Sequence, residues 1–287
     1  EDVIAGISLY RPGPMDFIPQ YIRGKNRPDT IHYDCPQLEP ILKATHGCIV
    51  YQEQVMQIVQ SLAGFTLGRS DLLRRAMSKK KLNVMEKERQ AFVYGNEAEG
   101  VPGCIKNGID EKIANKIYDE MIDFAQYAFN KSHAAAYAYV TYQTAFLKYY
   151  YPVEYMAALM TSVIDKPTKV AEYIQVCRQM NIPILPPDIN KGEYGFSVSG
   201  GSILYALSAI KSVGRPVIEA IVAERKEHGE YLSVKNFIER NMEAVNKRAI
   251  ENFIKAGALD CLEGNRHQKM VVFGQIVDDI SRNKKQS

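Results

Sequence analysis

The sequence contains no tryptophan, only five cysteines and no uninterrupted apolar run long enough to cross a membrane. The cysteines lie far apart and form no Cys-x-x-Cys pair, which argues against a disulfide framework or a zinc ribbon and favours the reducing cytoplasm. The first residues, Glu1-Asp2-Val3, are not a signal peptide, and the pattern starts without an initial methionine. We therefore expect a cytoplasmic segment of a longer protein, with no membrane partner.

Several signatures of catalytic sites are also missing. The acidic residues never form Asp-x-Asp, an arrangement that two-metal nucleotidyl transfer would use in a strand. There is no glycine-rich phosphate loop of the P-loop or Rossmann type. Four histidines have no partner at zinc-ligand spacing, namely His32, His46, His228 and His267. We therefore predict no catalytic residue, no metal site and no cofactor bound by this chain.

What is present is an ordinary globular composition of 287 residues, 46% of them apolar, which predicts a main domain and at least one smaller unit. The formal net charge is only +3, but the basic residues gather in short clusters. The clusters are Arg23–Arg27, Arg74–Arg75 with Lys79–Lys81, and Lys211, Arg215, Lys247 and Arg248. Local basic patches favour a phosphate-bearing partner, although a solvated helix face explains any one of them.

The periodicity predicts a mainly helical fold. Six prolines lead us to expect residues 1–48 to be irregular, and apolar repeats from about residue 51 predict helices. Ser70 is a candidate cap for a helix carrying Arg74 and Arg75. Asp110 is a candidate cap for the next strongly periodic helix, whose predicted buried stripe is Ile113, Ile117, Met121 and Phe124.

The second half of the sequence changes character around residue 181. The prolines of segment 182–187 require an extended chain, and Gly200-Gly201 between two short apolar segments predicts a β-hairpin. Helices return from residue 207 in two short pairs, and residues 271–287 are read as a polar C-terminal tail.

Five strings, taken together and in order, resemble one family, the C-family bacterial replicative DNA polymerases of the DnaE-type branch (the alpha subunit of DNA polymerase III). They are Leu9-Tyr10-Arg11-Pro12-Gly13-Pro14, Ile49-Val50-Tyr51-Gln52-Glu53-Gln54-Val55-Met56, Leu72-Leu73-Arg74-Arg75-Ala76-Met77, Phe129-Asn130-Lys131-Ser132-His133 and Leu185-Pro186-Pro187-Asp188-Ile189-Asn190. One such string is weak; five in this order cover nearly the whole chain.

The resemblance implies a polymerase fingers domain over residues 1–200, with 1–48 as a lead-in from the palm, followed by helix-hairpin-helix DNA-binding residues 201–270. It also implies that the palm, which holds Mg²⁺ through its aspartates, and the thumb belong to other parts of the same polypeptide. Contacts with the sliding clamp and other holoenzyme subunits would likewise lie outside this chain. The implied function is to bind incoming dNTP and primer-template DNA, without catalysis by the chain alone.

The resemblance assigns nucleotide contacts to two helix starts. Arg74 and Arg75 match the arginines that contact the triphosphate, and guanidinium forks suit phosphate oxygens. Tyr127 and His133 match positions of the nascent base-pair pocket, while the helix start at Asn130 and Lys131 is suited to an anion. The alternatives are a solvated basic face for the arginines and a histidine that merely caps its helix.

Two further groups are candidate DNA contacts. Lys79, Lys80 and Lys81 suit non-specific phosphate attraction, although an exposed charge run explains them almost as well. The first hairpin candidate contains Lys211, Ser212 and Gly214. Ser212 stands where the pattern usually has glycine, which predicts a less tight turn. A second, degenerate hairpin begins at Lys247 and Arg248, and a helical packing module is the alternative for both hairpins.

Two rival functions stay open on the sequence. A free-standing nucleic-acid-binding module would bind duplex DNA and ignore dNTP. A helical scaffold with solvated charges would bind no phosphate at all. The string Phe129–His133 argues against the first rival, because duplex binding does not require it.

Overall fold

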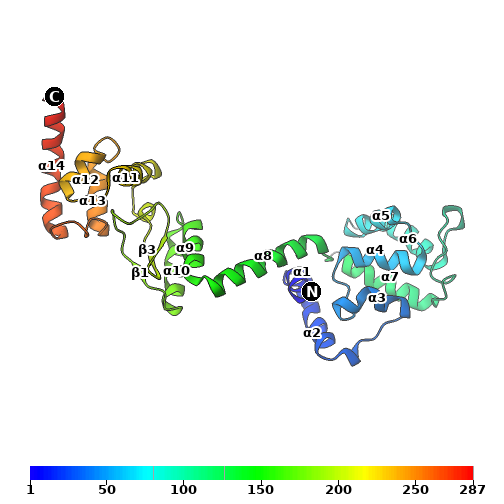
Figure 1. The fold of residues 1–287 in the computed structure, drawn as a ribbon. Coiled ribbons are helices and arrows are strands. Elements are labelled where there is room, and N and C mark those ends of the chain that lie inside the picture. Colours follow the sequence, from blue (N-terminus) through cyan, green and yellow to red (C-terminus); the bar gives the residue numbers. More distant parts are fainter. Residues whose placement is uncertain (80, 126, 287) are drawn as a thin grey trace. The chain divides into compact units, whose positions relative to one another are not determined.

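The computed structural model describes residues 1–79, 81–125 and 127–286 (Figure 1). The chain divides into two compact units, Glu1–Gln143 and Thr144–Ser287. The boundary falls inside helix α8 (Lys131–Tyr150), and each unit has its own buried cluster of apolar side chains. The boundary near residue 200 that the sequence suggests separates functions rather than compact units, and it stays a prediction.

The first 48 residues are helical rather than irregular. Their elements are α1 (Asp2–Leu9), η1 (Pro14–Phe17), α2 (Ile18–Asn26), η2 (Pro28–Thr30), η3 (Pro36–Leu38), α3 (Glu39–Leu42) and η4 (Lys43–Thr45). Five of the six prolines occupy the first or second position of five of these elements. Proline suits that position because its fixed φ matches the helix and its missing N–H would have no partner there. The prediction was wrong because proline begins these helices instead of interrupting them.

Four longer helices build the core of the first unit. They are α4 (Gln52–Ala63), α5 (Leu67–Ser78), α6 (Leu82–Tyr94) and α7 (Glu111–Ala125), with the short turn η5 (Glu97–Glu99) after α6. The predicted stripe of α7 is confirmed, since Ile117 and Met121 are fully buried and Ile113 and Phe124 pack against the same cluster. The cap is confirmed as well, because the Asp110 carboxylate accepts from two backbone N–H groups of the first turn.

The start of α5 differs from the prediction. Its cap is Thr66, whose hydroxyl accepts from the N–H of Arg69, whereas Ser70 lies buried inside the helix. Ser70 donates its hydroxyl to the carbonyl of Thr66 instead. Asp71 therefore lies in the body of α5, where it faces Arg74 and Arg75 three and four residues further on.

The second unit begins with two helices and a small sheet. Helices α9 (Pro152–Ser162) and α10 (Pro167–Gln179) precede strands β1 (Ile184–Leu185), β2 (Ser197–Ser199) and β3 (Ser202–Leu204). The sheet order is β1-β3-β2, with β1 parallel and β2 antiparallel to β3. The predicted hairpin is confirmed, since Gly200 and Gly201 both adopt the positive φ that this turn requires.

The remaining elements of the second unit are helical. They are η6 (Leu207–Ala209), α11 (Arg215–His228), α12 (Val234–Asn241), α13 (Lys247–Ala256) and α14 (Arg266–Gln286). Residues 271–286 therefore belong to a helix, and not to the expected polar tail. Val277 and Ile280 are buried in the core of this unit, because apolar residues recur at helix spacing among the charges.

Within the described part of the chain, no helix combines the length and the apolar character needed to cross a membrane.

Candidate functional site

The loop that precedes α8 is fixed to the start of α4 by backbone hydrogen bonds. The N–H of Phe129 donates to Val50 O at 3.1 Å, and the N–H of Gln52 donates to Phe129 O at 2.9 Å. Tyr51 and Phe129 form an isolated parallel bridge between these bonds. Two strings far apart in the sequence, Ile49–Met56 and Phe129–His133, therefore lie side by side.

The segment Arg11–Pro14 braces the same loop from the other side. The Arg11 guanidinium donates to Tyr127 O and lies 4.7 Å from the centre of the Phe129 ring. Gly13 packs beneath Tyr127, because a Cβ added there would lie 2.5 Å from that ring. The φ of Gly13 is 102°, which a side chain would strain. This segment thus has a structural role, as its stiffness suggests.

Arg74 is held at the same place. Its Nε and Nη2 donate to Asp71 Oδ1 at 3.0 and 2.7 Å, and its Nη1 donates to Gln52 Oε1 at 3.0 Å. The Gln52 side chain in turn donates to Ala128 O at 3.2 Å. One side chain, Gln52, therefore contacts both the predicted triphosphate-binding arginine and the predicted base-binding loop.

Arg75 is the more exposed of the two arginines. Its Nε lies 2.8 Å from Asp71 Oδ2, and its side chain is 63% exposed, compared with 21% for Arg74. The hydrogen bond from Arg74 and the charges of both arginines hold the pKa of Asp71 below its usual range. Asp71 is therefore ionised at neutral pH and orients both guanidinium groups.

Arg75 also lines a groove of about 330 Å³ between α5 and α6. Lys79 and Lys81 lie along the groove beside the apolar side chain of Leu72, and Arg69 contributes from within an ion-paired cluster. Lys80 lies outside the described residues. The predicted basic run thus forms part of a groove together with Arg75.

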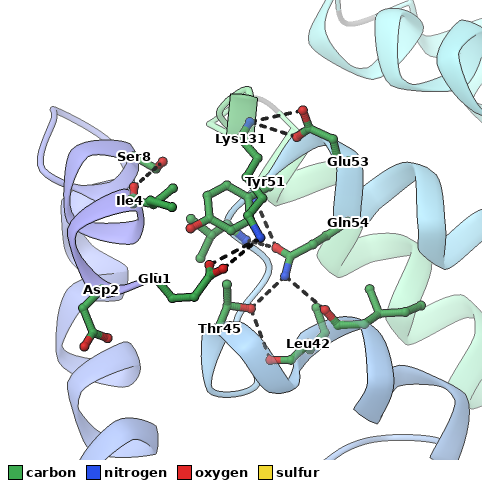
Figure 2. Close-up of polar contacts among 12 residues, drawn as sticks. Glu1, Asp2, Ile4, Ser8, Leu42, Thr45, Tyr51, Glu53, Gln54 and Lys131 are labelled. Atoms are coloured by element: carbon green, nitrogen blue, oxygen red, sulfur yellow. Dashed lines mark hydrogen bonds and ion pairs between the residues drawn. The ribbon is translucent and has the colours of Figure 1, made fainter. Parts of the chain in front are cut away.

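The N-terminus of α8 already holds an anion from the protein itself. Both oxygens of the Glu53 carboxylate accept from the N–H of Lys131, at 3.0 and 3.2 Å (Figure 2). Glu53 Oε1 also accepts from the Asn130 amide at 3.1 Å. The Lys131 ammonium lies 3.3 Å from a Glu1 oxygen and over the Tyr51 ring. A phosphate that binds these groups must compete with Glu53 and Glu1.

His133 does not cap the helix. The cap is Asn130, whose Oδ1 accepts from the N–H of His133 at 2.8 Å. The exposed imidazole lies between two aromatic rings, 5.4 Å from the Phe129 centre and 4.8 Å from the Tyr137 centre. Together with Tyr127, which is 40% exposed, these rings supply flat surfaces suited to a base.

The first hairpin of the second unit keeps the backbone shape of a glycine turn. Ser212 has a φ of 63°, in the left-handed region, and Gly214 directly precedes α11. The Asn252 amide of α13 donates to Lys211 O at 2.8 Å and fixes the turn against the next helix. The expectation of a looser turn at Ser212 is therefore wrong, because the serine accepts the strained conformation.

This strain predicts a stabilising substitution. Ser212→Gly removes the steric penalty of a side chain in the left-handed region, and we expect the free energy of unfolding of the second unit to rise by about 0.5–1 kcal/mol in urea titrations. Lys211→Gly is the control in the same turn, since its φ is not positive and the added flexibility should lower stability. Equal losses for both variants would contradict the claim of strain.

The second hairpin presents fewer free cations than its sequence suggests. Lys247 is paired with Asp278 of α14 at 2.6 Å, whereas Arg248 is exposed. Lys255, which the sequence did not single out, lines a pocket of about 450 Å³ together with Lys211 and Tyr205. No spacing in the sequence identifies that pair, because it depends on how α13 packs beside the first hairpin.

Among residues 1–79, 81–125 and 127–286, no three His, Cys, Asp or Glu side chains are placed to hold an ion. The carboxylates nearest the candidate site, Asp71 and Glu53, are both engaged by groups of the protein itself.

Two regions of this chain match known protein families. The family described as the bacterial DNA polymerase III alpha subunit finger domain matches residues 1–100, and the helix-hairpin-helix motif matches residues 181–269. DNA polymerase III subunit alpha of Chlamydia trachomatis is 46% identical over 288 residues, covering 100% of this chain and 23% of its own length. The same subunit of Thermus aquaticus is 49% identical over 266 residues, covering 91% of this chain and 21% of its own length.

The helical fold and these matches define a polymerase finger domain followed by a helix-hairpin-helix segment. The chain belongs to the bacterial DNA polymerase III alpha subunit family. It spans less than a quarter of the length of these two curated relatives.

Proposed function

We propose that this chain binds the incoming dNTP and the primer-template within a DNA-directed DNA polymerase that replicates bacterial DNA. The observation that carries the proposal is the contact of Gln52 with both Arg74 and the loop at Ala128. This contact joins Arg74, a cation of α5, to the loop before α8, which carries aromatic rings. Gripping a nucleoside triphosphate needs both: charge for the phosphates and flat surfaces for the base.

In this proposal different residues contact the phosphates and the base of the nucleotide. Arg74 and Arg75 neutralise the phosphates, and Lys131 approaches them once its contact with Glu1 is exchanged. Tyr127 and His133 contact the base of the nascent pair. Asn130 keeps the start of α8 in place by capping it.

The chemistry belongs to other parts of the polypeptide. Among the described residues no three potential metal ligands gather, and we assign the Mg²⁺ of the reaction to the palm. The thumb is a further partner in the same polypeptide, and the sliding clamp and other holoenzyme subunits bind through regions outside this segment.

This division predicts that the isolated 287-residue chain is inactive. With primer-template, all four dNTPs and Mg²⁺, a labelled primer should remain unextended, because no carboxylates of this chain hold the metal ions. Circular dichroism on the same sample provides the control that the helices are formed. Extension of the primer by the folded chain would contradict the assignment of catalysis to the palm.

We further propose that the helix-hairpin-helix segment binds the duplex behind the primer end. The turn at Ser212 and Gly214 presents backbone N–H groups, and Lys211 with Arg248 supplies charge. Lys247 contributes only if its pair with Asp278 opens. Two results together would favour the rival of a free-standing module. Duplex binding would be unaffected by dNTP and by Arg74→Ala, and the full-length protein would not bind dNTP.

Salt dependence tests the contact at Lys211. Because each neutralised phosphate contributes about −0.9 to the slope of log K against log [salt], Lys211→Ala should reduce the magnitude of that slope by about one. Fluorescence anisotropy of a labelled duplex, measured at several salt concentrations, gives the slope. Lys235→Ala, an exposed lysine of α12 paired within its own helix, is the control that should leave the slope unchanged.

A further inference from the structure

Gln52 is the first residue of α4 and makes three hydrogen bonds to two distant parts of the first unit. Its Oε1 accepts from Arg74 Nη1 at 3.0 Å, its Nε2 donates to Ala128 O at 3.2 Å, and its backbone N–H donates to Phe129 O at 2.9 Å. The side chain is half-buried between the partners. It is the described side chain whose hydrogen bonds join α5 directly to the loop before α8.

Only an amide of this length serves both side-chain bonds. A glutamine side chain carries an acceptor and a donor at its end, whereas glutamate lacks the donor and methionine lacks both. The acceptor faces a guanidinium and the donor faces a backbone carbonyl, so each end of the amide meets its complement. The two hydrogen bonds therefore fix the orientation of Arg74 and the position of Ala128 relative to each other.

The Arg74 guanidinium keeps free donors in this arrangement. A guanidinium has five N–H groups. Nε and Nη2 use one each on Asp71, and Nη1 uses one on Gln52, so one N–H of each terminal nitrogen remains. Two parallel donors at a fixed angle suit two oxygens of one phosphate.

The loop is held just as closely on the other side. Three successive carbonyls, from Tyr127 to Phe129, each accept a hydrogen bond, the first from Arg11 and the other two from Gln52. The Phe129 ring packs beside the His133 ring, at 5.4 Å between ring centres. A shift of the Gln52 amide would therefore move the aromatic surface as well as the arginine.

We infer that Gln52 is a positioning residue that fixes the triphosphate-binding Arg74 relative to the base-binding loop. The inference rests on the proposed nucleotide site and adds that the two halves of that site are set by one amide. Gln52 touches neither phosphate nor base. It acts through Arg74 and through the carbonyls of the loop.

The test is steady-state dNTP incorporation by the full-length alpha subunit that contains this chain. Gln52→Met should raise the dNTP KM about tenfold and lower kcat by less. The loss of both side-chain bonds leaves Arg74 without a fixed orientation, which weakens dNTP binding more than the chemical step. Gln52→Glu should give a smaller rise, since it keeps the acceptor for Arg74 and loses only the bond to Ala128. Gln57→Met, at an exposed position of the same helix, should leave both constants unchanged.

A double-mutant comparison separates positioning from general stability. If Gln52 acts through Arg74, the rise in KM for Gln52→Met combined with Arg74→Ala should be clearly smaller than the product of the two single effects. The thermal midpoint of each variant is measured alongside. The inference would be overturned if the rise in KM for the double variant equalled the product of the two single rises. It would also be overturned if the KM change followed the thermal midpoint in all variants, including Gln52→Glu.

The outcome also separates this inference from the proposed function. If Arg74→Ala alone leaves the dNTP KM unchanged, the proposed nucleotide site is wrong. If Arg74→Ala raises KM while Gln52→Met matches the Gln57→Met control, the site stands and only the role of Gln52 is refuted.

Discussion

Replacing Arg74 with alanine is expected to lower kcat/KM for dNTP incorporation by the full-length polymerase about a hundredfold. In the proposed site the substitution removes the cation that binds the triphosphate, and a charged hydrogen-bond donor in such a site contributes about 2–3 kcal/mol. It also leaves Asp71 with one fewer arginine partner and so adds uncompensated negative charge beside the nucleotide. Single-nucleotide incorporation at varied dNTP concentration gives the ratio.

The control for Arg74→Ala is Lys87→Ala on α6. Lys87 is 69% exposed and lies 3.9 Å from its nearest carboxylate, so its loss removes one positive charge of the same unit with little change in packing. We expect kcat/KM to stay within about twofold of the parent for this control. Equal losses for the two variants would show that net charge, and not the position of Arg74, governs nucleotide binding.

Replacing Gln54 with alanine is expected to lower the free energy of unfolding by about 3 kcal/mol. Gln54 is 5% exposed, and its Oε1 accepts from the N–H groups of Val50 and Tyr51 (Figure 2). Its Nε2 donates to Ile41 O and Thr45 Oγ1. Each buried group left without a partner costs about 1–3 kcal/mol, reduced where water enters the space.

Urea denaturation followed by circular dichroism measures this loss. Gln57→Ala is the matched control, because Gln57 lies one turn further along α4 with its side chain exposed. We expect it to change the free energy of unfolding by less than about 0.5 kcal/mol. A loss for Gln54→Ala no larger than that of the control would mean that its four hydrogen bonds do not hold the start of α4.

Local signals in the sequence predicted much of the fold. The cap at Asp110 and the stripe from Ile113 to Phe124 were predictable because both depend on residues within one helix. The turn at Gly200-Gly201 follows from the same logic, since glycine alone accepts two successive positive φ angles at little cost. The order of the five family strings identified the polymerase family before any contact was known.

Other features depend on choices that a local pattern leaves open. A proline is equally a breaker and a first residue of a helix, and in segment 1–48 the second role applies five times. Thr66 and Ser70 are both suitable caps, and the burial of Ser70 decides between them. The charges of segment 271–286 concealed the apolar spacing that ends in Val277 and Ile280.

The sequence named the candidate residues of the site but not the contacts between them. The motif named Arg74 and the loop from Tyr127 to His133, whereas the link through Gln52 joins residues 22 and 76 positions away. The sequence singled out Gln52 only as part of the string Ile49–Met56. Nor did the sequence show that Glu53 occupies the N–H group at the start of α8, because that contact spans 78 positions.

The most direct measurement is the structure of the full-length alpha subunit with primer-template DNA and a non-reacting dNTP analogue. It should place oxygens of the triphosphate within about 3.2 Å of the Arg74 guanidinium and the nascent base pair against the ring of Tyr127 or His133. A triphosphate in another cleft, with Arg74 bonded only to Asp71 and Gln52, would contradict the proposed nucleotide site.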